Sequence, residues 1–155
     1  MKIEDDEYIL VSACLAGINC KYNGGNNLNS DILKLVQEGR AILVCPEQLG
    51  GLSTPRKPSE IIDRVSNIVI SSDGTLVTKE YEKGAYETLK IANLYHIKKA
   101  ILKKNSPSCG NNSIYNGTFT HTLTSGEGIT AKLLHENGIQ VINEEEYVKE
   151  LRKEC

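Results

Sequence analysis

The chain has 155 residues and carries 18 Lys and Arg against 20 Asp and Glu, a formal net charge of −2 at pH 7. This balance argues against a nucleic-acid-binding module, which needs a clustered basic excess to bind phosphates. No apolar run approaches the roughly 20 residues of a membrane span, and the acidic N-terminus lacks the pattern of a signal peptide, so we expect a cytoplasmic protein with one domain over residues 1–155.

Short apolar runs and amphipathic segments alternate along most of the chain. Their periodicity predicts strands over residues 8–12, 41–44, 100–102 and 139–142, and helices over residues 29–38, 79–95, 129–136 and 144–153. The second strand is apolar throughout, as expected of a strand buried on both faces. This order favours an α/β fold, a mostly parallel sheet with helices on both faces in a Rossmann-like three-layer arrangement.

Turn-forming residues mark the connections. An Asp-Gly pair at residues 73–74 lies between the runs 67–70 and 76–78, which predicts a small hairpin. An Asn-Gly pair at residues 116–117 marks a second turn. The segment 45–60 contains three prolines and two glycines, so we expect no regular structure there. Loops of this length in a compact domain are usually functional or disordered.

Three of the five cysteines follow predicted strands. Cys14 and Cys45 come just after the first two strands, and Cys109 lies a few residues beyond the third. If these strands are parallel neighbours, the three thiols gather at the carboxyl edge of the sheet, where open α/β sheets bind ligands. A single free cysteine is usually a small buried hydrophobe, but three at one edge favour a metal or iron–sulfur centre. Three thiolates leave one position open, as a reactive centre requires.

The cysteines alone do not identify the metal. Thiolates bind zinc and iron–sulfur clusters alike, and this spacing matches neither a zinc ribbon nor a bacterial ferredoxin. Of the three histidines, His96 and His135 fall near helix ends, where we expect surface residues. His121 follows the second turn, and nothing in its spacing makes it a ligand. Without a histidine partner, three cysteines would leave one iron of a four-iron cluster open to substrate.

Two further residues are candidates for catalysis. Glu47 lies two residues after Cys45 and is either a solvated glutamate or, beside a metal centre, a group that moves protons. Ser106 lies three residues before Cys109 and either forms a turn or directs its hydroxyl to the substrate. We also expect Ser12 and Ser108 to donate hydrogen bonds to sulfur.

The remaining residues of interest allow more than one interpretation. Cys20 is a backup ligand, a resolving thiol or, as we expect, a packed or partly exposed free thiol, and Cys155 is expected to be disordered. Arg56 either pairs with Glu60 to hold the loop or faces an anionic substrate.

Several short motifs share a single resemblance. They are residues 12–17 (Ser-Ala-Cys-Leu-Ala-Gly), 22–24 (Tyr-Asn-Gly), 45–47 (Cys-Pro-Glu), 50–52 (Gly-Gly-Leu), 55–60 (Pro-Arg-Lys-Pro-Ser-Glu) and 106–110 (Ser-Pro-Ser-Cys-Gly). With these motifs the chain resembles a bacterial family long described as a domain of unknown function, some members of which are identified as 2-thiouracil desulfurases. The resemblance covers nearly the whole chain.

This resemblance implies a [4Fe-4S] cluster held by Cys14, Cys45 and Cys109, with the fourth iron binding the sulfur of a small thiolated substrate. The active-site glutamate and serine of the family map onto Glu47 and Ser106. The implied reaction replaces C=S by C=O in a thiolated pyrimidine, with water as the oxygen source and hydrosulfide as the product.

Two other functions remain open from the sequence. A zinc-thiolate hydrolase would use the same cysteines, but the protein would be colourless where a cluster would make it brown. A non-catalytic module that binds iron–sulfur or sulfide would hold the cluster but turn over no thiolated base.

Overall fold

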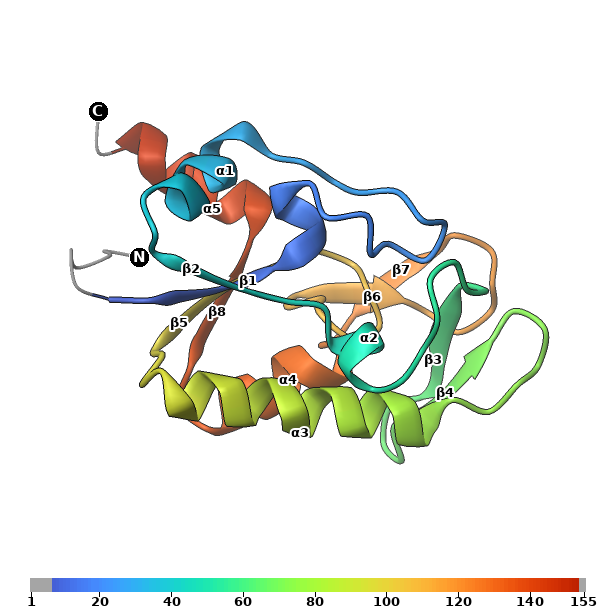
Figure 1. Ribbon diagram of the computed structural model, residues 1–155. Helices are drawn as coiled ribbons and strands as arrows, with labels where there is room; N and C mark the ends of the chain where they lie inside the picture. The colour runs from blue at the N-terminus through green and yellow to red at the C-terminus, as the bar shows by residue number, and fades with distance from the viewer. Residues whose placement is uncertain (1–6, 154–155) are drawn as a thin grey trace.

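The computed structural model describes residues 7–153 of the chain. Within this part, the central sheet consists of the parallel strands β1 (Ile9–Ser12), β2 (Ala41–Val44), β5 (Lys99–Leu102) and β8 (Gln140–Asn143). Their order is β2-β1-β5-β8, and each neighbouring pair is parallel (Figure 1). The predicted α/β fold with a parallel sheet is confirmed.

Helices cover both faces of the sheet, as predicted. The helices α1 (Ser30–Gln37) and α5 (Glu144–Lys153) lie on one face, and α3 (Thr78–Leu94) and α4 (Ile129–Glu136) lie on the other (Figure 1). Successive strand residues point to opposite faces. Ile9 and Val11 of β1 therefore pack in the core under α1 and α5, while Leu10 packs in the core under α3 and α4. Over residues 7–153, no helix is both long and apolar enough to cross a membrane.

Strand β2 differs from its prediction. It forms an edge of the sheet, so Ala41, Ile42 and Leu43 are only half-buried and Val44 alone is buried. Its apolar sequence reflects packing against the helices of both faces rather than a central position.

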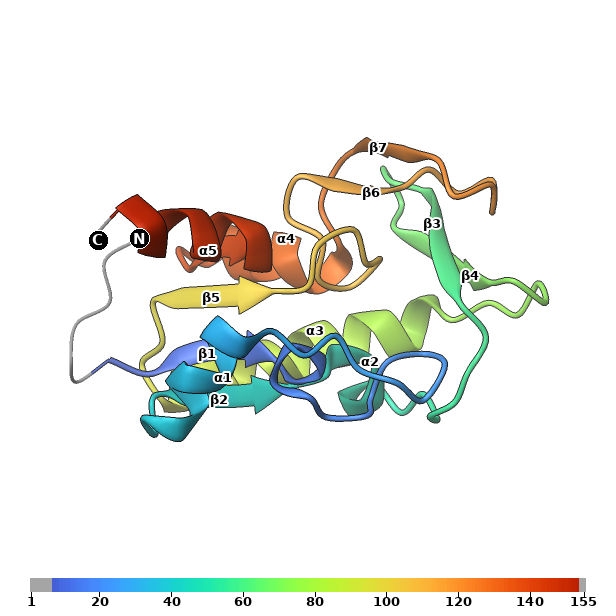
Figure 2. The ribbon, with the colours of Figure 1, turned by 90° about the horizontal axis from the view of Figure 1, so that it is seen from above.

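Two small antiparallel hairpins lie beyond the carboxyl ends of the parallel strands (Figure 2). One pairs β3 (Ser59–Asp63) with β4 (Ile68–Ser71), and the other pairs β6 (Ser113–Tyr115) with β7 (Leu123–Ser125). The predicted Asn-Gly turn lies between β6 and β7. The chain also turns back on itself around Asp73-Gly74, as predicted: Ile70 and Leu76 form an antiparallel bridge, and the Val77 N–H donates to the Val69 carbonyl at 3.0 Å. The main strand partner of β4 is nevertheless β3.

The segment after β2 is more regular than its prolines and glycines suggested. Pro46 begins the short helix α2 (Pro46–Leu49), a position where proline is favoured because its missing N–H has no partner in the helix. Another short helix, η1 (Ala13–Ala16), follows β1 directly. Each of the first two strands is thus followed by a helical turn: η1 carries Cys14, and α2 carries Glu47.

Candidate functional site

The strand order creates a ligand-binding position at the carboxyl edge of the sheet. The chain passes from β1 to β2 on one side and later returns to β5 on the other side of β1. Open α/β sheets bind ligands where the strand order reverses in this way. A cavity of about 480 Å³ lies there, lined among others by Cys14, Cys20, Glu47 and Cys109. The lining also includes Val44 and Pro46, the residues directly before and after Cys45 in the sequence.

Cys14 is held at this cavity by the loop that follows η1. The side-chain amide of Asn27 donates to Cys14 Sγ at 3.4 Å, and the Asn27 N–H donates to the Cys14 carbonyl at 2.9 Å. Burial raises the pKa of the Cys14 thiol; the hydrogen bond from Asn27 opposes this rise, and the nearby Cys45 adds to it.

Cys109 is buried and accepts hydrogen bonds from two hydroxyl groups. Ser12 Oγ and Ser108 Oγ lie 3.4 and 3.5 Å from Cys109 Sγ, as predicted for these serines. Ser12 Oγ also accepts from the Lys103 N–H at 2.9 Å, which ties the end of β1 to the end of β5. Burial raises the pKa of Cys109 to about 12, and both serine hydrogen bonds oppose this rise.

The N-terminus of α4 holds the loop that carries Cys109. The N–H groups of Ile129 and Thr130 donate to the carbonyls of Pro107 and Ser108 at 2.8 and 2.9 Å. The first N–H groups of a helix have no partner within the helix, so these loop carbonyls satisfy them. The loop that carries the Cys109 thiol is thereby held in place by a helix that begins 20 residues after Cys109 in the sequence.

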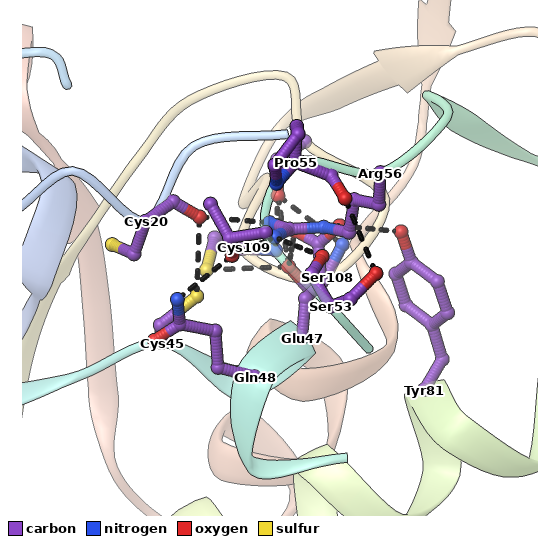
Figure 3. A network of polar contacts seen from close by, with 12 residues as sticks. Cys20, Cys45, Glu47, Gln48, Ser53, Pro55, Arg56, Tyr81, Ser108 and Cys109 are labelled. Carbon is purple, nitrogen blue, oxygen red and sulfur yellow. Dashed lines mark hydrogen bonds and ion pairs between the residues drawn. The ribbon is translucent and has the colours of Figure 1, made fainter. Parts of the chain in front are cut away.

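Cys45 caps the start of α2 and lies next to Cys20 (Figure 3). In its thiol form, Cys45 Sγ donates to the Cys20 carbonyl at 3.8 Å. Hydrogen bonding between the two thiols lowers the pKa of Cys45 to about 7 and raises that of Cys20. Cys20 is 2% exposed, so the prediction of a packed thiol is confirmed, and Cys155 lies outside the described residues.

Glu47 forms the centre of a hydrogen-bond network between α2, α3 and the loops (Figure 3). Its Oε1 accepts from the Tyr81 hydroxyl at 2.6 Å and from Arg56 Nε at 3.4 Å. Its Oε2 accepts from Ser108 Oγ at 3.1 Å. All three partners are donors, so Glu47 is held as a hydrogen-bond acceptor and is not a freely solvated side chain.

Arg56 supports this network and does not pair with Glu60. Beside its contact with Glu47, it donates from Nη2 to the Cys20 carbonyl at 2.9 Å and from Nη1 to Thr54 Oγ1 at 2.8 Å. Glu60 instead accepts from the N–H of Gly117 at 2.9 Å and stabilises the connection between β6 and β7. The alternative of an Arg56–Glu60 ion pair is wrong.

Ser106 fulfils the turn role and also reaches the cavity. Its Oγ accepts from the N–H groups of Cys109 and Ser108 at 2.7 and 3.2 Å. Ser106 Oγ also lies 3.1 Å from Ser108 Oγ, and either hydroxyl can donate in this contact. Because Ser106 lines the cavity, its hydroxyl can still donate a hydrogen bond to a bound ligand.

The three histidines differ in whether they lie at the cavity. His96 and His135 are exposed, as expected for surface residues. His121 lines the cavity, with its ring edge-on to Tyr115 at a centroid distance of 6.3 Å.

Sequence reasoning missed two residues of α3 that matter here. Tyr81 looks like any aromatic residue on the buried side of a helix, and its contact with Glu47 is too distant in sequence to be inferred. Gly84 carried a signal, because an isolated glycine inside a helical pattern usually has a packing reason. A Cβ on Gly84 would lie 1.9 Å from the Pro46 carbonyl, so this glycine allows α2 to touch α3.

The donor set fits an iron–sulfur cluster better than a single ion. Over residues 7–153, no three His, Cys, Asp or Glu side chains converge on one metal-ion position. A zinc ion needs all its ligands about 2.3 Å away or closer, whereas a multi-iron cluster is bound by cysteines spread over several irons. Thiols from separate loops, with hydrogen-bond donors directed at their sulfurs, suit the larger group.

Comparison with known proteins agrees with this arrangement. The family model of the 2-thiouracil desulfurases matches residues 9–146. The protein YbbK of Bacillus subtilis (strain 168), described as uncharacterized, is 47% identical over 145 residues, which cover 89% of this chain and 96% of YbbK. The solved structure of the [4Fe-4S]-dependent thiouracil desulfidase TudS superposes with a TM-score of 0.86 at 41% identity, over 92% of this chain and 94% of TudS.

Proposed function

The chain belongs to the 2-thiouracil desulfurase family, and we propose that it is a non-redox, [4Fe-4S]-dependent desulfidase that replaces C=S by C=O in a thiolated pyrimidine. The observation that carries this proposal is the meeting of Cys14, Cys109 and Glu47 at one cavity, with Cys45 between the lining residues Val44 and Pro46 in the sequence. Family membership supports the reaction class, and the cavity chemistry supports the choice of residues.

Cys14, Cys45 and Cys109 would hold the cluster. When bound, the cluster supplies a soft, Lewis-acidic iron suited to the sulfur of a thiocarbonyl. Because three cysteines would bind three of the four irons, the fourth iron would be open to the substrate. The hydroxyl groups of Ser12 and Ser108 and the amide of Asn27 would orient and stabilise the thiolates.

Glu47 would manage the protons of the reaction. Water supplies the oxygen that replaces sulfur, and it must lose both of its protons as the new C=O forms. The Glu47 carboxylate, held by three donors, is oriented to take one of these protons and pass it to the departing hydrosulfide, and the other proton is released to solvent. Ser106, at the cavity wall, would donate a hydrogen bond that orients the substrate.

The rest of the cavity suits a small planar substrate. Tyr22, Tyr115 and Phe119 form part of its lining, and aromatic faces stack on flat rings. A volume of about 480 Å³ lies within the range of small-molecule sites. We therefore expect a thiolated base or a close derivative.

An anaerobic assay tests the function directly. The protein is loaded with iron and sulfide, its iron per chain and visible absorbance are measured, and hydrosulfide release is followed with 2-thiouracil, 4-thiouracil and, as a non-pyrimidine control, thiourea. We expect a brown protein whose turnover of at least one thiopyrimidine scales with iron content. A protein that is fully loaded with the cluster but releases no hydrosulfide from any thiolated base would be a binding module. A colourless protein that is active with zinc would be the alternative zinc-thiolate hydrolase.

A further inference from the structure

A buried tyrosine, Tyr81, contacts Glu47, the residue proposed to transfer protons. Tyr81 belongs to α3, is 2% exposed, and donates its hydroxyl to Glu47 Oε1 at 2.6 Å. We propose that Tyr81 is a positioning residue that holds the Glu47 carboxylate so that Oε2 serves the reaction. This inference rests on the proposed function.

The two oxygens of Glu47 have different surroundings. Within residues 7–153, Oε1 accepts from both Tyr81 and Arg56, whereas Oε2 accepts from Ser108 alone. Ser108 Oγ also lies 3.5 Å from Cys109 Sγ, so Oε2 is the oxygen on the side of the cysteine loop. Because Oε1 already has two donors, Oε2 is the oxygen with capacity to accept a proton.

Arg56 cannot perform this positioning alone. Its contact with Glu47 is long, at 3.4 Å, and its terminal nitrogens bind the Cys20 carbonyl and Thr54. The Tyr81 contact is the shortest of the three to Glu47 and comes from a rigid helix.

The backbone arrangement brings these two groups together. Gly84 lies one turn after Tyr81 on α3, and its lack of a side chain lets the Pro46 carbonyl of α2 approach. Burial and then the charge of Glu47 raise the pKa of the Tyr81 hydroxyl well above 10, so it remains a donor throughout the neutral range.

Substitution of the hydroxyl alone tests the proposal in the cluster-loaded enzyme. We expect Tyr81→Phe to keep wild-type iron per chain and a KM within about twofold, while kcat falls about 10- to 100-fold, as for loss of one hydrogen bond to a charged group. In a Glu47→Gln background, Tyr81→Phe should change kcat by less than about twofold, because the two residues act as a unit. Tyr147→Phe is the matched control, a buried tyrosine in the core under α5, and should leave kcat unchanged.

A spectroscopic readout tests the contact without turnover. In protein labelled with ¹³C at tyrosine Cζ, the Glu47→Gln substitution should shift the Tyr81 signal and leave the other six of the seven tyrosines in place. The positioning role is refuted if Tyr81→Phe retains wild-type kcat, if it loses the cluster, or if its effect is additive with Glu47→Gln. An unshifted Tyr81 signal refutes it as well. If the wild-type protein turns over no thiolated base, the proposed function fails, and the Cζ signal still decides the contact.

Discussion

The four described cysteines do not have equivalent surroundings. Ser12, Ser108 and Asn27 direct donors at the sulfurs of Cys109 and Cys14, and donors directed at a sulfur stabilise its thiolate. Cys20 is different: Arg56 and Cys45 contact its carbonyl oxygen. The hydrogen bonds to Cys14 and Cys109 therefore offset part of the rise that burial causes in the pKa values of these thiols, and the backbone of Cys20 supports its neighbours.

Iron content of single serine variants tests this distinction. We expect Cys14→Ser, Cys45→Ser and Cys109→Ser to lose the cluster or bind it poorly, because each removes one of the three proposed ligands. Cys20→Ser should retain it and serves as the control. Full iron per chain in Cys109→Ser, or loss of iron in Cys20→Ser, would contradict the ligand assignment.

Glu47→Gln separates cluster binding from chemistry. The amide preserves the size of the side chain but cannot accept a proton, so we expect cluster content near wild type and a fall in turnover of about 10²–10⁴-fold. Glu136→Gln, an exposed substitution on α4, is the control. Loss of the cluster would make Glu47 a ligand or a structural support, and full activity would move the proton transfer to another group.

At the scale of elements, the contact between α2 and α3 determines where the candidate acid or base lies. Gly84 faces the Pro46 carbonyl, and reciprocally a Cβ on Gly50 would lie 1.9 Å from the Glu80 carbonyl. The two backbones therefore touch without intervening side chains. Because Cys45 caps α2 and Glu47 lies within it, a displacement of α2 would move a proposed ligand and a proposed catalytic group together.

Gly84→Ala should reverse the usual effect of this substitution in a helix. Alanine in a helix interior is normally more stable than glycine by about 1 kcal/mol. Here the added Cβ must push α2 away, and overpacking of this kind costs about 1–3 kcal/mol. We expect a lower free energy of unfolding in urea and reduced iron per chain, with exposed Lys83→Ala on the same helix as control. A stabilised Gly84→Ala protein would show that α2 adjusts freely.

At the scale of the whole molecule, the sequence predicts what depends on local patterns. The apolar runs of β1 and β5 and the amphipathic helices identify the sheet, and the position of Cys14 and Cys45 after their strands follows from it. Contacts between distant segments could not be predicted. The Asp-Gly pair at residues 73–74 does mark a turn bridged by Ile70 and Leu76, but it does not indicate that the main partner of β4 is β3. In the same way, nothing near Glu47 in the sequence indicates Tyr81, 34 residues away.

The core of the sheet is built from apolar side chains, whereas the segments of the site also meet through hydrogen bonds, such as those from Arg56 to the Cys20 carbonyl and from Ser108 to Glu47. Ile9, Leu10 and Val11 in β1 and Ile101 in β5 are fully buried, so we expect the sheet to fold without a metal. The proposed ligands come from three separate segments after β1, β2 and β5. A cluster would join these segments, and a ligand bound only by the folded state stabilises the regions it joins.

Amide hydrogen exchange, measured on cluster-free and cluster-loaded protein, should show this difference between the core and the loops of the site. After loading, we expect at least about tenfold slower amide exchange in three segments, residues 13–29, 45–58 and 103–112. Local opening of these loops would then require release of a thiolate from the cluster. Amides of β1 and β5 should change little, since their exchange already depends on opening of the core. The anaerobic Cys109→Ser protein treated identically is the control and should show no protection. Protection spread evenly over the sheet would mean instead that the cluster is needed for the fold itself, as in small metal-dependent domains.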